Sequence, residues 1–459
     1  MNEALGTQVP RRIARGLIRS LADGTPVMEG IRYIHVGHTR WIDAQVELLE
    51  ELAEDHDSDV LFVRGAYGAG KTHFLGCVQD RAREAGWVTA HLECRRDKIE
   101  LDRFETVYAR ILYKLRSRRM LEDAVEQDLD PAEIDGGRWI LDRWAADMLR
   151  RAGLGQGSVR RPMEVEERLY SLLQTTVLQR NLPGSFQRAL CAYARATLVG
   201  NADLCTELVG WFRGEPSHVK IPPVLLQKPG LGVRGPSSFG RPALAVDLPP
   251  ISRAASLEML RGILWVIRQT GHKGLVLAVD ELEEIAKLRP KRRQDQCFQA
   301  LREFVDNADG ELGLRNLCTY FAATPEMFDS PDYFRRYDAL ASRIEPVGED
   351  INWRSPVIDL DRTPLSDQEF RLLARKIREV HNIAYSWDGS HAVTDAVLGR
   401  IVDAVLSARY RIAKPRLLCR VVVSELERAR LSGAGYVPRP SHDAAVREAA
   451  ERLKREQEA

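Results

Sequence analysis

The feature that most constrains this fold is the stretch Gly65-Ala-Tyr-Gly-Ala-Gly70-Lys71-Thr72, a complete match to the pattern G-x-x-x-x-G-K-[S/T]. It follows an apolar run at 59–64 (DVLFVR), which is typical of a buried strand, and it precedes a helical pattern. Glycines let a backbone curl around phosphate oxygens, and a helix N-terminus supplies oriented N–H groups. The alternative is a turn that only caps a helix. The pattern therefore predicts a phosphate site on an α/β core.

This loop predicts ATP and Mg²⁺ as cofactors. Lys71 would reach the β- and γ-phosphates, and the Thr72 hydroxyl would ligate magnesium. The predicted nucleotide contacts of the loop are Gly65, Ala66, Tyr67, Gly68, Ala69, Gly70, Lys71, Thr72 and His73.

A second apolar run, 275–279, ends in the adjacent carboxylates of Asp280 and Glu281. Asp280 would hold magnesium through water, and Glu281 would orient and polarise the attacking water. An acidic pair after a strand is often only a helix N-cap, so this alternative stays open. Together with the loop, the pair predicts ATP hydrolysis.

Three further residues are candidates for completing the catalytic site. Thr324 ends the predicted strand 317–325, where it could lie beside the γ-phosphate or could merely start a Thr-Pro turn. Arg343 could stabilise transition-state charge from a neighbouring subunit, which would require an oligomer, and Arg416 could touch the nucleotide from a helical lid. For each arginine, a solvated or ion-paired surface position is the alternative.

Strands alternating with helices predict a parallel-sheet α/β core, a P-loop NTPase, with a large helical insertion and a helical C-terminal lid. The core strands are expected at 59–64, 87–93, 274–281 and 317–325. The predicted boundaries are 1–56 for an N-terminal helical segment, 57–124 and 251–362 for the two parts of the core, 125–250 for the insertion with an irregular Pro/Gly-rich loop at 221–250, 363–435 for the lid and 436–459 for a charged tail.

Charge and composition limit the partners and the cellular location that the sequence predicts. The 459 residues carry a formal charge of +1, so a polyanion partner would need a local site. No apolar run is long enough for a membrane span, and the seven scattered cysteines predict a reducing, cytoplasmic location. No metal-ligand spacing or Cys-His pairing stands out among the ten histidines. Basic clusters could meet DNA or form solvated helix faces; they comprise Arg11, Arg12, Arg15 and Arg19, and Arg289, Lys291, Arg292 and Arg293.

Taken together, these motifs resemble the AAA+ ATPases of the initiator-like branch. The resemblance implies Walker B at Asp280 and Glu281, sensor 1 at Thr324, an arginine finger at Arg343 and sensor 2 at Arg416. It also implies that the segment 33–37 is the adenine-side loop, with Ile34 and Val36 as its apolar contacts.

A closer resemblance is to the BREX-system ATP-binding proteins of the BrxC and BrxD type, and the length fits the smaller BrxD type better. The stretches that carry it are 11–27, 62–75, 104–108, 274–283 and 323–328. It implies a role in bacterial phage defence beside a DNA methyltransferase and a phosphatase-like partner.

Three functions fit these features. The first is an ATPase whose hydrolysis drives conformational change or assembly in a DNA-associated defence complex. The second is a nucleotide-gated scaffold with negligible turnover. The third is an initiator- or transposition-type ATPase that acts directly on duplex DNA.

Overall fold

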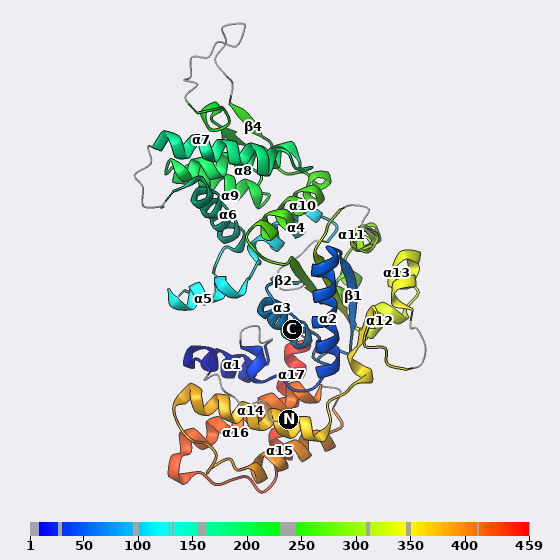
Figure 1. The fold of residues 1–459 in the computed structure, drawn as a ribbon. Coiled ribbons are helices and arrows are strands. Elements are labelled where there is room, and N and C mark those ends of the chain that lie inside the picture. Colours follow the sequence, from blue (N-terminus) through cyan, green and yellow to red (C-terminus); the bar gives the residue numbers. More distant parts are fainter. Residues whose placement is uncertain are drawn as a thin grey trace, which may run out of the picture. The chain divides into compact units, whose positions relative to one another are not determined.

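The chain folds as an α/β protein, with one main sheet and many helices (Figure 1). The computed structural model describes residues 9–25, 30–94, 101–127, 129–130, 133–154, 162–229, 245–308, 313–345, 350–410 and 413–458. Within these ranges, no helix combines the length and the apolar character that crossing a bilayer requires. The chain divides into two compact units, each with residues from separate stretches of the sequence.

The main sheet has five strands in the order β2-β5-β6-β1-β7. Its strands are β1 (Asp59–Arg64), β2 (Val88–Glu93), β5 (Leu275–Asp280), β6 (Leu317–Ala323) and β7 (Val357–Asp359). β1 pairs with β7 and β2 with β5, both in parallel. Every residue of β5 and β6 is buried, which explains why these strands read as continuous apolar runs. The four predicted strands are confirmed, whereas the three-residue β7 was not predicted.

Unit 1 comprises Met1–Leu48, Leu61–Arg81 and Tyr320–Ala459. Its helices are α1 (Arg11–Asp23), η1 (Ile31–Tyr33), most of α2 (Thr39–Asp55) and of α3 (Lys71–Glu84), α12 (Pro325–Asp329), η5 (Phe334–Arg336), α13 (Asp338–Ile344), η6 (Leu360–Arg362), α14 (Asp367–Tyr385), α15 (Asp395–Ser407), α16 (Lys414–Ser432), η7 (Gly433–Gly435) and α17 (Asp443–Glu458).

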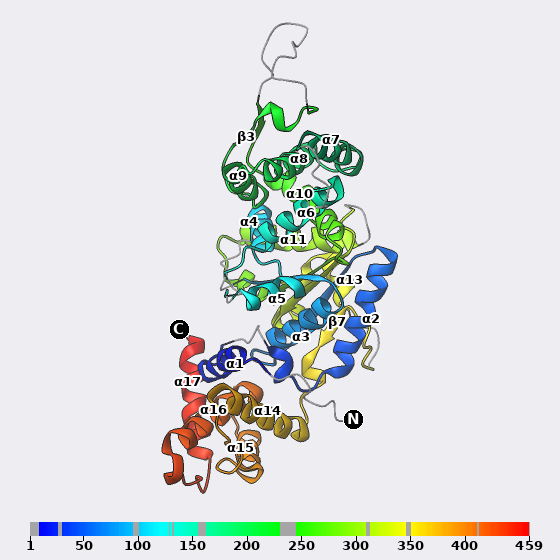
Figure 2. The same cartoon turned by 60° about the vertical axis from the view of Figure 1, so that its left-hand side comes forward.

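The first helix packs on the C-terminal helices α14 and α16 (Figure 2). Its buried face is apolar at helical spacing and consists of Ala14, Leu17, Ile18 and Leu21. Arg11 Nε and Arg15 Nε donate to the carbonyl of Ala384, at 3.3 and 3.1 Å, near the C-terminus of α14. Cations at a helix C-terminus satisfy carbonyls that have no partner in the helix, so part of this basic cluster is structural.

Unit 2 comprises Leu49–Val60 and Ala82–Thr319. Its helices are α4 (Phe104–Tyr113), α5 (Arg118–Glu126), α6 (Gly136–Ala152), α7 (Pro162–Leu173), the π-helical η2 (Gln174–Leu178), α8 (Gly184–Leu198), α9 (Ala202–Phe212), η3 (Pro223–Leu225), α10 (Arg253–Gln269), η4 (Leu282–Lys287) and α11 (Lys291–Ala308). Helices α6 to α9 lie within the stretch 125–250, where a helical insertion was predicted. Its predicted boundaries remain a prediction.

A small antiparallel sheet of β3 (Val219–Ile221) and β4 (Val246–Leu248) brackets the segment expected to be an irregular loop. The middle of that predicted loop, 230–244, lies outside the described residues. The expectation was wrong at its two ends, because three-residue strands are too short to show an alternating pattern.

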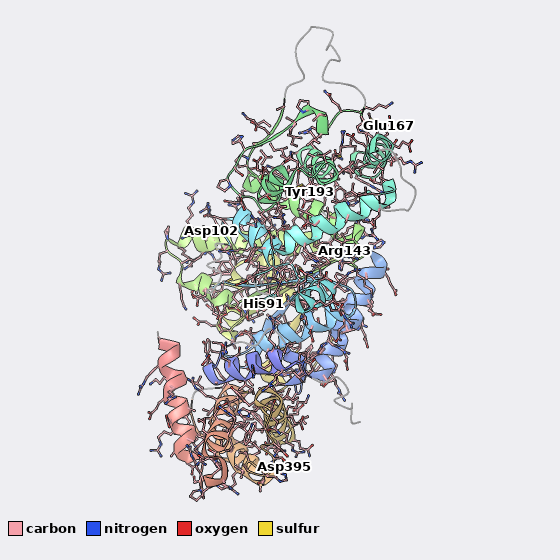
Figure 3. All side chains as sticks on the ribbon, turned by 90° about the vertical axis from the view of Figure 1, so that its left-hand side faces the viewer. His91, Asp102, Arg143, Glu167, Tyr193 and Asp395 are labelled. Carbon is pink, nitrogen blue, oxygen red and sulfur yellow. The ribbon has the colours of Figure 1, made fainter. Side chains whose placement is uncertain are left out.

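Local capping fixes the start of the C-terminal helices. Ser366 and Glu369 form a reciprocal capping box on α14: Ser366 Oγ accepts from Glu369 N at 3.3 Å, and Glu369 Oε2 accepts from Ser366 N at 2.7 Å. Asp395, labelled in Figure 3, begins α15 and accepts from Arg378 Nη2 of α14 at 2.7 Å. The contact between Arg378 and Asp395 thus joins α14 to α15.

We predict that Ser366→Ala lowers the free energy of unfolding of unit 1 by about 1 kcal/mol, because the backbone N–H of Glu369 loses the Ser366 hydroxyl as its acceptor. Denaturant titration followed by circular dichroism measures the effect. The control is Ser407→Ala at the exposed end of α15, where the hydroxyl donates only to Ala404 O, and its change should stay within about 0.5 kcal/mol. Equal effects of the two substitutions would contradict the capping role.

Candidate functional site

The Gly65–Lys71 loop leaves β1 and leads directly into α3. Gly65 N donates to Ala323 O at the end of β6, at 3.4 Å, and Phe74 N donates to Gly70 O at 2.7 Å, which closes the first turn of the helix. Gly68 and Gly70 have φ of 80° and 102°, a region where a side chain is strained. The sequence puts glycine where the turn requires it.

The ammonium of Lys71 folds back over this loop. Its Nζ donates to Gly65 O at 3.0 Å and to Ala66 O at 3.3 Å, and the residue is only 7% exposed. A buried ammonium needs such partners, because an unpaired charge away from water is strongly unfavourable. The loop therefore holds a positive charge at its centre.

A carboxylate from η6 already contacts one loop amide. Ala66 N donates to Asp361 Oδ2 at 2.9 Å and to Oδ1 at 3.2 Å. The loop backbone thus presents an N–H group to an anionic oxygen, which is the contact that a phosphate would make. Sequence analysis missed Asp361, because 295 positions separate it from Ala66 and no local pattern connects them.

The C-terminal helices meet the loop at the start of α16. A Cβ built on Gly68 would lie 2.6 Å from the Cβ of Ala413, the N-cap residue of α16. Arg416, in the first turn of that helix, packs against Gly24 at the end of α1, and its Nε is buried without a hydrogen-bond partner among the described residues. The predicted lid arginine thus belongs to the helix that touches the loop.

The structure places the other two predicted residues as follows. Thr324 is the N-cap of α12 and follows Ala323, whose carbonyl accepts from Gly65 N, so it lies at the strand end beside the loop. Thr324 also precedes Pro325, which starts α12. Its position therefore fits both a place beside the γ-phosphate and the start of a Thr-Pro turn. Arg343 lies in the last turn of α13, which packs on η5.

Within unit 2, β5 ends at Asp280, which is 1% exposed. Asp280 Oδ1 accepts from Glu281 N at 2.8 Å, and Asp280 O accepts from Cys94 N at 3.1 Å. Glu281 has φ of 60°, a left-handed conformation that is strained by roughly 1 kcal/mol in a residue with a side chain. Although Glu281 precedes η4, its side chain makes no capping hydrogen bond in the described structure. The N-cap alternative therefore does not explain these side chains.

The predicted adenine-side segment lies against α3. Ile34 and Val36 are buried, at 2% and 7% exposed. Between them, His35 O accepts from Lys376 Nζ of α14 at 2.8 Å, and His35 Nδ1 lies 3.1 Å from His73 Nε2. The segment, the loop helix and a C-terminal helix thus meet at His35.

Comparison with known proteins identifies one family. The model of the BREX system ATP-binding protein BrxC/D matches residues 9–222 and 241–434. No curated protein matches the chain. The sequence resemblance to BrxC and BrxD is confirmed at that level, and the preference for the BrxD type stays a prediction.

We predict that Gly68→Ala weakens ATP binding about tenfold, because the new methyl group combines left-handed strain of about 1–2 kcal/mol with a contact to Ala413. Titration with a fluorescent ATP analogue measures the affinity. Gly86→Ala is the matched control, since Gly86 has φ of 91° but no atom within 4 Å of a built Cβ. Adding Ala413→Gly should recover part of the loss; no recovery would contradict the contact.

Proposed function

The chain belongs to the BREX system ATP-binding protein BrxC/D family, and we propose that it is an AAA+-like ATPase that binds Mg-ATP at the Gly65–Thr72 loop and hydrolyses it. The observation that carries the proposal is the buried ammonium of Lys71 at the centre of a glycine loop, with a loop amide that already binds a carboxylate. This arrangement suits a triphosphate, whose charge needs a lysine and backbone N–H groups. In this proposal, the residues from Gly65 to His73 contact the nucleotide.

Magnesium fits the residue types of this proposal. The Thr72 hydroxyl follows Lys71 at the start of α3, and Asp280 offers a buried carboxylate at the end of β5. Hydroxyl and carboxylate oxygens are the ligands that Mg²⁺ prefers. When bound, the ion would neutralise developing phosphate charge.

The remaining roles follow from the same proposal. Glu281, held in a strained conformation after β5, orients and polarises the attacking water, because strained backbone persists where a site demands it. Thr324, which follows the end of β6, lies beside the γ-phosphate. Arg416 contacts the nucleotide from the lid, and Arg343 acts in a neighbouring subunit, so the active species is an oligomer.

Hydrolysis would drive conformational change or assembly in a cytoplasmic, DNA-associated anti-phage defence system, with methyltransferase or phosphatase-like partners. The nucleotide-gated scaffold remains the alternative. Measuring the particle size with and without ATP, and comparing it with the rate of ATP hydrolysis, distinguishes the scaffold from the ATPase. Direct action on duplex DNA is less supported, because Arg293 of the basic cluster is paired with Asp102 at 3.0 Å. Direct action on DNA would give a DNA affinity that falls steeply with salt concentration and that is lost when the basic residues at 289–293 are neutralised.

We predict that Lys71→Ala weakens ATP binding at least about tenfold, because the only buried ammonium of the loop is removed. Isothermal titration calorimetry with Mg-ATP measures the affinity. Lys220→Ala, at an exposed position of β3, is the control and should bind as the wild type does. An unchanged affinity in Lys71→Ala would place the nucleotide elsewhere.

We predict that Glu281→Gln keeps ATP affinity and lowers steady-state hydrolysis by roughly 100-fold or more, because the amide no longer polarises water. Phosphate release measures turnover. Glu284→Gln, whose carboxylate pairs with Lys287 at 2.6 Å in η4, is the nearby control. A hydrolysis rate in Glu281→Gln equal to that of the wild type would contradict the catalytic role of Glu281. If the wild-type protein binds ATP but does not hydrolyse it, the gated scaffold is favoured.

A further inference from the structure

Three side chains of types that can ligate a metal converge beside the start of α3. They are His35, His73 and Cys77, and their ligand atoms all lie within 4.8 Å of one another. His35 Nδ1 is 3.1 Å from both His73 Nε2 and Cys77 Sγ, and the two imidazoles stack with centroids 5.4 Å apart. His73 and Cys77 are four residues apart, on one face of the helix. Sequence analysis passed over this i, i+4 pair, because His35 joins it only in three dimensions.

The spacing fits a four-coordinate zinc ion after a small relaxation. With Zn–N near 2.0 Å and Zn–S near 2.3 Å, tetrahedral geometry separates two nitrogens by about 3.3 Å and a nitrogen and a sulfur by about 3.5 Å. The observed separations of 3.1 Å are a few tenths of an ångström shorter. The third separation, between His73 Nε2 and Cys77 Sγ, is at most 4.8 Å.

The imidazoles have the protonation state that a metal requires. Burial lowers the pKa of His35 to about 4 and the pKa of His73 to about 3, so both rings are neutral at pH 7 and keep a lone pair for a ligand. Burial raises the pKa of the Cys77 thiol above its usual range. A metal must therefore displace the thiol proton, as it does in zinc sites generally.

The surroundings hold His35 in place. Lys376 Nζ donates to its carbonyl at 2.8 Å, which ties the histidine to α14. The charged and titratable groups that act on the cluster are Lys376, Glu369, Asp80 and His38. Lys376 lowers the pKa of all three groups, whereas Glu369 raises the pKa of His35 and Asp80 raises that of Cys77.

We propose that His35, His73 and Cys77 form a Zn²⁺ site that fastens the segment 34–36 to α3 and leaves a fourth position for water. Two nitrogens and one sulfur select a borderline-soft ion such as zinc, whereas magnesium takes oxygen ligands. The site is thus chemically distinct from the magnesium site proposed for ATP.

Cobalt substitution tests the site on the full chain. Protein stripped with a chelator is titrated with Co²⁺, without nucleotide or magnesium. We expect one equivalent to bind with tetrahedral visible bands and a thiolate-to-cobalt charge-transfer band, both abolished by added Zn²⁺. Cys77→Ser should remove the charge-transfer band, and His35→Asn should lower zinc affinity at least about tenfold in a competition with a chromophoric chelator.

Three controls match these variants. Cys419→Ser removes a partly buried cysteine of α16, and His391→Asn removes a histidine whose side chain is 91% exposed. Thr72→Ala removes the hydroxyl proposed for magnesium. All three should keep the wild-type cobalt spectrum. Folded wild-type protein that binds no stoichiometric cobalt, or a charge-transfer band that persists in Cys77→Ser, overturns the zinc site and leaves a cluster of hydrogen bonds.

Discussion

The burial of one ammonium group governs the geometry around the loop. Lys71 is almost removed from water, so its charge must find oxygen partners nearby, and the carbonyls of Gly65 and Ala66 provide them. Those carbonyls can point inward only if the loop curls tightly, which Gly68 allows through its left-handed backbone. The curl in turn aims the amide of Ala66 toward a carboxylate. A short glycine loop thereby presents a backbone N–H group to the carboxylate of Asp361.

Residues distant in sequence complete this arrangement within unit 1. Asp361 reaches Ala66 from the segment after β7, Ala413 meets Gly68 from α16, and Lys376 binds the carbonyl of His35 from α14. The C-terminal helices therefore contact the loop and its helix directly. A change in the packing of these helices would therefore alter the contacts of the loop.

Sequence alone predicted the parts that rest on local patterns. The buried strands appear as apolar runs, and the loop at 65–72 carries its own signature, so the α/β fold and the position of Lys71 followed from the residues. The three-residue β7 has no readable period, and Asp361 is linked to the loop only by tertiary folding. His35 likewise joins His73 and Cys77 through packing. Residue roles at Thr324, Arg343 and Arg416 remain predictions, because spacing gives position and not chemistry.

The packing of α1 on α14 has a consequence for biosynthesis. The two ends of the contact between Arg11 and Ala384 are 373 residues apart, and ribosomes add roughly 5–20 residues per second. The partner helix α14 is therefore synthesised roughly 20–75 s after α1. During that interval the nascent chain carries an amphipathic helix with an uncovered face. Exposed apolar surface of this kind is what makes incompletely folded chains prone to aggregation.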